Sequence, residues 1–292
     1  MRTDHVFVLA PPRSGTKLLS RMLGRSEGTY LITEHTRKPP EEINQAKDQD
    51  FWLSAVGFSN SPSEEVDYDA DKFQSLNVLW NAKADGKRLI IKNPQNVARV
   101  AALRTAFPEA QFVWLIRDPW FSIQSMLGGD AAGHKNHMVV RASEVFQYQD
   151  PLAQCAATWA LALDRAKAYK RDTDATIRYE ALLADPKTEM VRLSKILGLN
   201  GAIENGAADL PREGRTSIGL MQYLLYRCGD ADKVVELIEP RARELGYPLR
   251  PVGRSGEIIR EGVRYFLRWC RKPKWRLPYG YPIARRFIHW RY

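Results

Sequence analysis

The sequence lacks the features of a secreted or membrane-spanning protein. It contains no run of about 18 apolar residues, the minimum for a spanning helix. The apolar run at residues 5–10 is too short for the core of a signal peptide, and no small-residue cleavage site follows it. Cysteine is scarce and forms neither a CxxC pair nor a metal-ligand spacing; the three residues are Cys155, Cys228 and Cys270. We therefore expect a cytoplasmic protein with reduced thiols.

The sequence also has little net charge outside its C-terminal end. The formal net charge is +10. Residues 251–292 contain eleven Lys or Arg and two Glu, a balance of +9, whereas residues 1–250 contain 33 basic and 32 acidic residues, a balance of +1. The tail also holds nine aromatic residues: Tyr265, Phe266, Trp269, Trp275, Tyr279, Tyr281, Phe287, Trp290 and Tyr292. The basic charge therefore belongs to the tail and needs an explanation separate from that of the body.

A tail that mixes cations with aromatics suits an anionic membrane surface. Peripheral contact of residues 251–292 with the inner membrane surface is therefore one expectation. Packing of the tail across the domain, or against a second copy in a homodimer, is the alternative. We do not expect nucleic acid as a partner.

Short apolar runs alternate with amphipathic segments along the first 250 residues. The apolar runs predict buried strands at 5–10, 29–33, 89–92, 111–116 and 175–178. The amphipathic segments predict helices at 17–25, 97–107, 119–127, 152–171, 187–197 and 230–245. Polar or Gly-rich stretches predict loops at 35–70, 128–136 and 200–217, the first with short helices. The alternation indicates an α/β domain over residues 1–250, with a P-loop-like parallel sheet flanked by helices on both faces, followed by the tail at 251–292.

The turn between the first strand and the first helix has the character of an anion site. It reads Pro-Pro-Arg-Ser-Gly-Thr-Lys, and its central residues are Arg13, Ser14, Gly15, Thr16 and Lys17. Backbone N–H groups and the positive end of the helix dipole point at one spot in such a turn. Gly15 allows a close approach to a phosphate, and the cationic side chains add charge-assisted hydrogen bonds. The order Gly-Thr-Lys does not match the G-x-x-x-x-G-K-[ST] pattern of a nucleoside triphosphatase.

Two further motifs follow strands downstream. An Arg-Asp-Pro sequence beginning at Arg117 follows the strand at 111–116, and Ser125 lies eight residues later. The sequence IRYEALLADP, residues 177–186, contains Tyr179. Arginine offers a planar fork for phosphate oxygens, and a serine hydroxyl adds one more donor.

Together the three motifs resemble the family of sulfotransferases that use 3′-phosphoadenosine 5′-phosphosulfate (PAPS), which carry [KR]-[ST]-G-[ST] between the first strand and helix. The resemblance implies that the first loop holds the 5′-phosphosulfate through its backbone and the side chains of Arg13 and Thr16. It implies that Arg117 and Ser125 clamp the 3′-phosphate and that Tyr179 lies beside the adenine. The two anion sites would then face each other across one nucleotide, and the product would be adenosine 3′,5′-bisphosphate.

The resemblance also supplies candidates for catalysis. Members of the family place a catalytic Glu shortly after the second strand, where this sequence has Glu34. His35 is the alternative base, because cytosolic members use His. Lys92 resembles a Lys before Pro in bacterial members and would place a cation on the bridging or sulfuryl oxygen, with Arg13 as a second catalytic cation. A singly charged sulfuryl group needs little help from a metal, so we expect no metal site.

One departure from the family concerns the 3′-phosphate. Cytosolic members carry an Arg-Lys-Gly loop near the C-terminus, and this sequence has no such tripeptide. Arg212 and Arg215 are the candidates to replace it. The departure places the chain nearer the bacterial and carbohydrate-type branches.

The expected activity is transfer of a sulfuryl group from PAPS to a hydroxyl of a carbohydrate, glycolipid or small molecule. Two alternatives belong to other classes: a nucleotide-dependent kinase built on the same strand, loop and helix, and a non-catalytic membrane-binding protein led by the tail.

Overall fold

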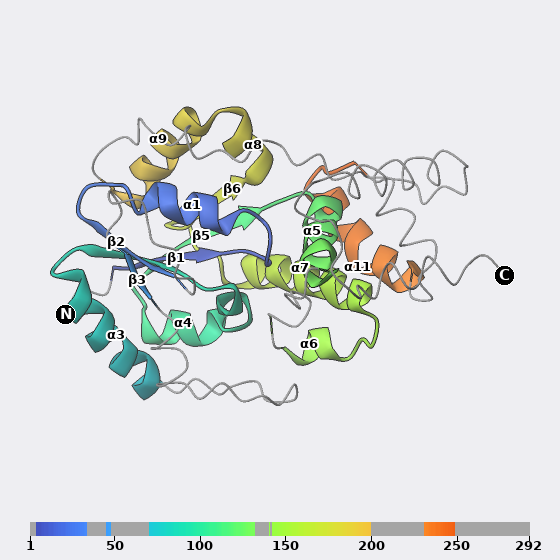
Figure 1. Cartoon of the computed structure of the whole chain (residues 1–292), viewed down its shortest axis with the longest axis horizontal. Coiled ribbons are helices and arrows are strands. Elements are labelled where there is room, and N and C mark those ends of the chain that lie inside the picture. Colours follow the sequence, from blue (N-terminus) through green and yellow to red (C-terminus); the bar gives the residue numbers. More distant parts are fainter. Residues whose placement is uncertain are drawn as a thin grey trace, which may run out of the picture.

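The computed structural model describes residues 4–33, 45–47, 70–131, 140, 142–199 and 231–248 (Figure 1). The strands are β1 (Val6–Leu9), β2 (Thr29–Thr33), β3 (Gln45–Lys47), β4 (Arg88–Lys92), β5 (Gln111–Ile116) and β6 (Ala175–Arg178). The helices of the first half are α1 (Thr16–Leu23), α3 (Ala70–Ala84), the 3₁₀ helix η1 (Pro94–Ala98), α4 (Val100–Ala106) and α5 (Pro119–Ala131). Those of the second half are α6 (Ser143–Phe146), α7 (Pro151–Tyr169), α8 (Tyr179–Ala184), α9 (Pro186–Leu197) and α11 (Ala231–Glu244).

The strands form one parallel sheet in the order β3-β2-β4-β1-β5-β6. β1 lies between β4 and β5, and all four of its residues are buried. Its side chains alternate between two cores: Phe7 and Leu9 face one side of the sheet, and Val6 and Val8 face the other. A strand buried on both faces needs apolar residues at every position, which explains the continuous run VFVL.

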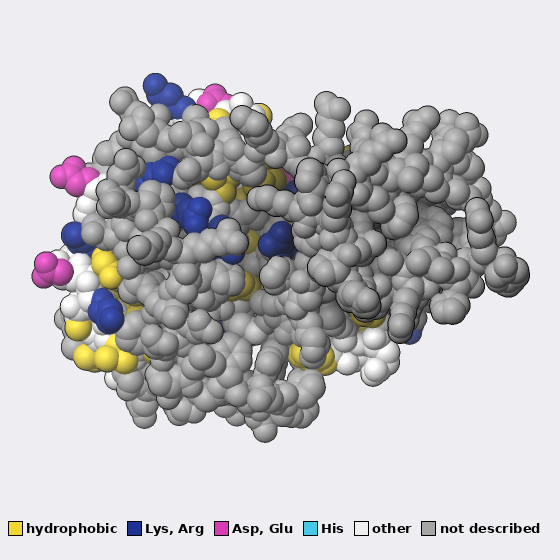
Figure 2. Space-filling view, in the orientation of Figure 1, with side chains coloured by type: hydrophobic (Ala, Val, Ile, Leu, Met, Phe, Trp, Pro, Cys, Tyr) yellow, Lys and Arg dark blue, Asp and Glu magenta, His cyan; other side chains and the backbone are white. Residues whose placement is uncertain are grey.

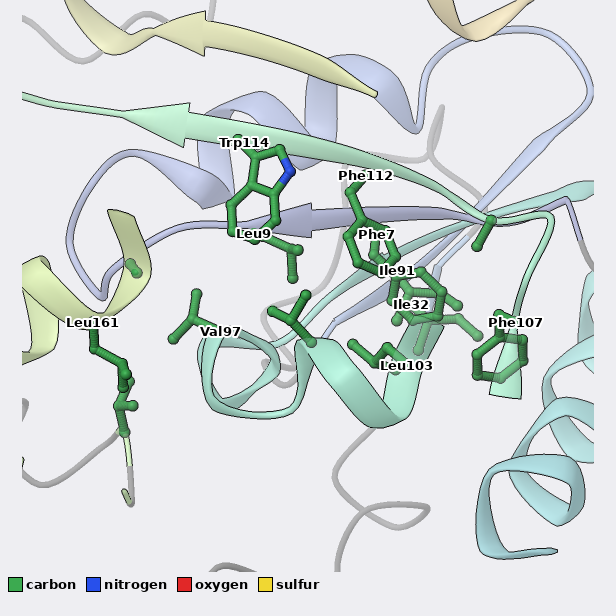
Figure 3. Close-up of a cluster of buried hydrophobic side chains, with 14 of the residues drawn as sticks. Phe7, Leu9, Ile32, Ile91, Val97, Leu103, Phe107, Phe112, Trp114 and Leu161 are labelled. Atoms are coloured by element: carbon green, nitrogen blue, oxygen red, sulfur yellow. The ribbon is translucent and has the colours of Figure 1, made fainter. Parts of the chain in front are cut away.

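Helices cover both faces of the sheet. α1, α8 and α9 lie over one face, and α3 and α4 lie over the other (Figure 1). The core under α3 and α4 is rich in aromatic rings, and the Phe7 ring contacts those of Phe107 and Phe112 (Figure 3). A third cluster joins α5, α7 and α11 beside the end of β5. None of the described helices combines the length and apolar character needed to cross a bilayer.

The predicted α/β architecture with a parallel, P-loop-like sheet is confirmed. All five predicted strands form, and those at 29–33, 111–116 and 175–178 have the expected bounds. The helices predicted at 152–171 and 187–197 form one or two residues away from those limits. The helix expected at 97–107 is divided into a 3₁₀ turn, η1, and the shorter α4.

Two loop predictions are wrong in part. The segment 128–136 does not begin as a loop, because α5 continues through two glycines to Ala131. Glycine costs about 1 kcal/mol in a helix, and burial of Ile123 and Met126 beside α7 outweighs it. The segment 35–70 contains the strand β3, which pairs with β2 at the edge of the sheet. The loop predicted at 200–217 and the tail at 251–292 lie outside the described residues.

A buried ion pair fixes the chain between α7 and β6. The Asp174 carboxylate accepts hydrogen bonds from Arg104 Nη2, from the Phe112 amide at 2.8 Å and from the Arg171 amide at 2.9 Å. Arg104 also donates to the Tyr169 and Ala110 carbonyls. Burial lowers the pKa of Arg104, and the Asp174 charge opposes that shift.

We expect Asp174→Ala to lower the free energy of unfolding by about 3–5 kcal/mol, because it leaves the Arg104 charge buried without its partner. Urea unfolding followed by circular dichroism measures this loss. Asp172→Ala is the matched control, because Asp172 is exposed two residues away, and its cost should stay within about 0.5 kcal/mol. Equal losses for the two variants would contradict a role for the buried pair.

Candidate nucleotide-binding site

The predicted site residues follow the carboxyl ends of neighbouring strands. The first loop follows β1, Lys92 ends β4, Arg117 follows β5 and Tyr179 follows β6. Because β4, β1, β5 and β6 are adjacent and parallel, these ends lie along one edge of the sheet. This edge is where open α/β sheets bind ligands.

The first loop has the backbone of an anion-binding turn. Arg13 and Gly15 both adopt positive φ, at 65° and 97°. Gly15 is the N-cap residue of α1, and no side chain in the described part of the protein caps that terminus. Ser14 is buried, and its Oγ lies 3.3 Å from Ser122 Oγ on α5. The loop before α1 is therefore hydrogen-bonded to α5, and no described side chain occupies the first N–H groups of α1.

Hydrogen bonds join the first loop to the end of β5. Arg117 Nη1 donates to the Arg13 carbonyl at 2.7 Å, and Arg13 Nε donates to Ser125 Oγ at 3.4 Å. The two anion sites expected from the sequence are thus brought together. The chain positions 13, 117 and 125 meet in space, although 104 residues separate the first pair and 112 separate Arg13 from Ser125.

The electrostatics of this contact favour an anion. Burial lowers the pKa of Arg117 most; Tyr179, Glu180 and Asp118 raise it, and the neighbouring Arg13 charge lowers it further. Neither arginine forms a salt bridge with a carboxylate of the described residues. Several Lys and Arg side chains also lie on the face that carries α1, as Figure 2 shows. Two cations held together in this way repel each other, and a bound phosphate would relieve that repulsion.

Tyr179 covers the first loop. A Cβ added at Gly15 would lie 2.3 Å from Tyr179 Cε2, so the ring packs directly on the glycine. The Arg117 guanidinium lies 4.5 Å from the centroid of the same ring. The ring is half-buried and links β6 to both anion-binding segments. Its contact with adenine remains a prediction.

Lys92 lies at the same edge, buried at the end of β4. In the sheet register it is opposite Val8 of β1 and Thr33 of β2. Thr33 is the last described residue before Glu34, so the predicted base directly follows the register partner of Lys92. Thr16 is buried and Lys17 is exposed in the first turn of α1.

Four predicted site residues lie outside the described part of the chain: Glu34, His35, Arg212 and Arg215. Their roles remain predictions. Within the described ranges, no group of three or more His, Cys, Asp or Glu residues gathers that could hold a metal ion.

Residues that were not predicted from the sequence hold the end of β5. Asp118 caps α5, its Oδ1 accepting from the Trp120 amide at 2.8 Å. Trp159 Nε1 donates to the Arg117 carbonyl at 3.0 Å, and Glu180 accepts from the Asp118 amide at 2.9 Å. An Asp before Pro at a helix start is a recognisable cap signal, whereas the other two contacts join distant segments that no local pattern connects.

A parallel α/β sheet with a positive-φ turn between β1 and α1 and a cationic end of β5 is a P-loop-like α/β fold. A model of the sulfotransferase family matches residues 5–202, more than half of the chain. The chain therefore belongs to the sulfotransferase family.

Curated relatives share part of the sequence. Protein-tyrosine sulfotransferase A of Caenorhabditis elegans is 21% identical over 200 residues, which cover 66% of this chain and 50% of that protein. The omega-hydroxy-beta-dihydromenaquinone-9 sulfotransferase Stf3 of Mycobacterium tuberculosis is 28% identical over 117 residues, which cover 39% of this chain and 29% of that protein. The matches thus span half or less of these relatives.

Solved structures share the fold. The sulfotransferase domain from the curacin biosynthetic pathway is 15% identical with a TM-score of 0.52, covering 85% of this chain and 99% of that one. Sulfotransferase STF9 from Mycobacterium avium is 15% identical with a TM-score of 0.51, covering 84% of this chain and 78% of that one.

We expect Gly15→Ala to be more destabilising than Gly28→Ala by about 1–3 kcal/mol, the usual cost of forcing atoms into a packed site. Both glycines have positive φ, at 97° and 71°, so both variants strain the backbone. Of these two positions, only at Gly15 would an added Cβ clash with an aromatic ring, that of Tyr179. Nothing lies within 4 Å of a Cβ added at Gly28.

Urea unfolding of the two variants, each also in a Tyr179→Ala background, isolates this contact. Removal of the ring should reduce the cost at Gly15 to that at Gly28. An unchanged difference would show that Tyr179 does not pack on Gly15.

Proposed function

We propose that the protein transfers a sulfuryl group from PAPS to an acceptor hydroxyl. The observation that carries this proposal is the meeting of Arg13, Arg117 and Ser125 beside the Gly15 turn. Membership of the sulfotransferase family gives this cationic site its chemistry. PAPS carries a phosphosulfate on the 5′ position of its ribose and a phosphate on the 3′ position. Two anionic groups fit a site whose donors come from the ends of two separate strands.

The donor set fits the phosphates of this nucleotide. The backbone of residues 14–17 and the side chains of Arg13 and Thr16 would hold the 5′-phosphosulfate. Arg117 and Ser125 would hold the 3′-phosphate, with Arg212 and Arg215 as further candidates. When bound, PAPS supplies an activated sulfuryl group with a phosphate as its leaving group.

The protein's own residues would supply positioning and proton transfer. Glu34 would accept the proton of the acceptor hydroxyl, with His35 as the alternative base. Lys92 and Arg13 would stabilise negative charge on the bridging and sulfuryl oxygens. The in-line arrangement that such a transfer needs resembles that of phosphoryl transfer.

The acceptor is a hydroxyl of a carbohydrate, glycolipid or small molecule in this proposal. The basic aromatic tail at residues 251–292 supports contact with an anionic membrane surface, where a lipid acceptor would be accessible. The same composition suits packing against the domain or against a second copy in a homodimer.

Thermal shift with adenosine 3′,5′-bisphosphate separates this function from that of a kinase. A ligand at 100 times its Kd stabilises the fold by about 2.7 kcal/mol, so the bisphosphate should raise the Tm clearly. Arg13→Ala and Arg117→Ala should reduce that rise, whereas Arg243→Ala should not, because Arg243 is an exposed arginine on α11. A rise with ATP and Mg²⁺ alone would favour the kinase instead.

Glu34→Gln should bind the bisphosphate as the unmodified protein does, yet lose turnover at least about a hundredfold, because the amide cannot accept the proton. Transfer of radiolabelled sulfate from PAPS to glycan and lipid extracts measures turnover. His35→Gln is the matched variant and should retain most activity. Full activity in Glu34→Gln, with loss in His35→Gln, would reassign the base.

A further inference from the structure

Three consecutive residues at the junction of β6 and α8 contact three different parts of the molecule. Arg178 donates to the Leu245 carbonyl at the end of α11. Tyr179 packs on the first loop, and Glu180 accepts a hydrogen bond from the segment after β5. The junction therefore touches both anion-binding segments and the end of α11.

The peptide unit between Arg117 and Asp118 is hydrogen-bonded at both of its ends. Its carbonyl accepts from Trp159 Nε1 at 3.0 Å, and its N–H donates to Glu180 Oε1 at 2.9 Å. A peptide unit is planar, so two bonds at opposite ends fix its orientation. That orientation sets the direction in which the Arg117 side chain leaves the backbone.

Glu180 is itself held in place by a residue that follows α11. Its second oxygen, Oε2, accepts from the Tyr247 hydroxyl at 3.1 Å. Tyr247 is buried, and the Arg178 guanidinium lies 4.9 Å from the centroid of its ring. Burial first and the adjacent Glu180 charge second hold the pKa of Tyr247 well above its ordinary value, so the hydroxyl stays protonated and able to donate.

Two contacts hold the Arg117 side chain itself among the described residues. Its guanidinium donates to the Arg13 carbonyl and lies on the Tyr179 ring. Neither contact fixes the backbone from which the side chain starts. Glu180 and Trp159 together supply that restraint, and Glu180 does so although most of the residue lies at the surface.

We propose that Glu180 is a positioning residue that orients Arg117 toward the 3′-phosphate of the bound nucleotide, with Tyr247 holding Glu180 in place. This inference rests on the proposed function, because it needs a nucleotide whose 3′-phosphate meets Arg117. Tyr247, which follows α11, would thus support the nucleotide site without contacting the nucleotide itself.

The test compares two ligands that differ only in the 3′-phosphate. Isothermal titration calorimetry gives the Kd of adenosine 3′,5′-bisphosphate and of adenosine 5′-phosphate for the full chain and its variants. Glu180→Ala should weaken the bisphosphate about tenfold and change adenosine 5′-phosphate less than about twofold. Glu236→Ala removes an exposed carboxylate of α11 and should change neither.

Two further variants separate position from charge. Glu180→Gln keeps an oxygen that can accept from the Asp118 amide, so it should recover most of the affinity for the bisphosphate. Tyr247→Phe should weaken the bisphosphate in the unmodified chain and add nothing in the Glu180→Ala background, as expected for a residue that acts through Glu180.

Equal losses for the two ligands would overturn the inference, because they would indicate general damage to the site. A loss in Glu180→Gln as large as in Glu180→Ala would also overturn it and point to charge alone. Failure of the unmodified protein to bind the bisphosphate is a different result, which overturns the proposed function and this inference with it.

Discussion

The hydrogen bond from the Arg117 guanidinium to the Arg13 backbone, at the carboxyl ends of β5 and β1, is the interaction on which the rest of the candidate site depends. Arg117 is bound to the backbone of Arg13, and Arg13 reaches Ser125, so the ends of β1 and β5 share one network. Like charges this close repel, and partial burial removes water that would screen them. The parallel order of the strands creates this arrangement, and the anionic nucleotide that we propose as the ligand would reduce the repulsion.

The strands of the sheet centre were predictable from the sequence because burial on both faces demands unbroken apolar runs, as in β1 and β5. β3 was missed because its residues are Gln, Ala and Lys at an edge that pairs on one side only. α3 was missed because exposed Val78 and Leu79 interrupt the pattern set by buried Leu76 and Trp80. Sequence periodicity reports burial, and it fails where burial is partial or apolar residues face the solvent.

The residues predicted to contact the ligand were easier to recognise in the sequence than the residues that hold them in place. Gly15 and Arg117 lie in short motifs whose chemistry can be read locally. Glu180 and Tyr247 lie 67 residues apart, and Glu180 lies 62 residues from the amide that it binds. No periodicity connects such positions, because tertiary packing alone brings them together. The residues predicted to contact the ligand can thus be recognised in the sequence, whereas the residues that hold them in place are identified only in the structure.

The packing of the Tyr179 ring on Gly15 also constrains which residue can occupy position 15. These residues are 164 positions apart, yet the ring occupies the space where any larger residue at position 15 would place its Cβ. The first loop, which follows the central strand β1, is thus covered by a residue that follows β6, the outermost strand on that side of the sheet. A larger residue at position 15 therefore requires the ring at position 179 to move or to be replaced, whereas a smaller residue at position 179 is compatible with Gly15.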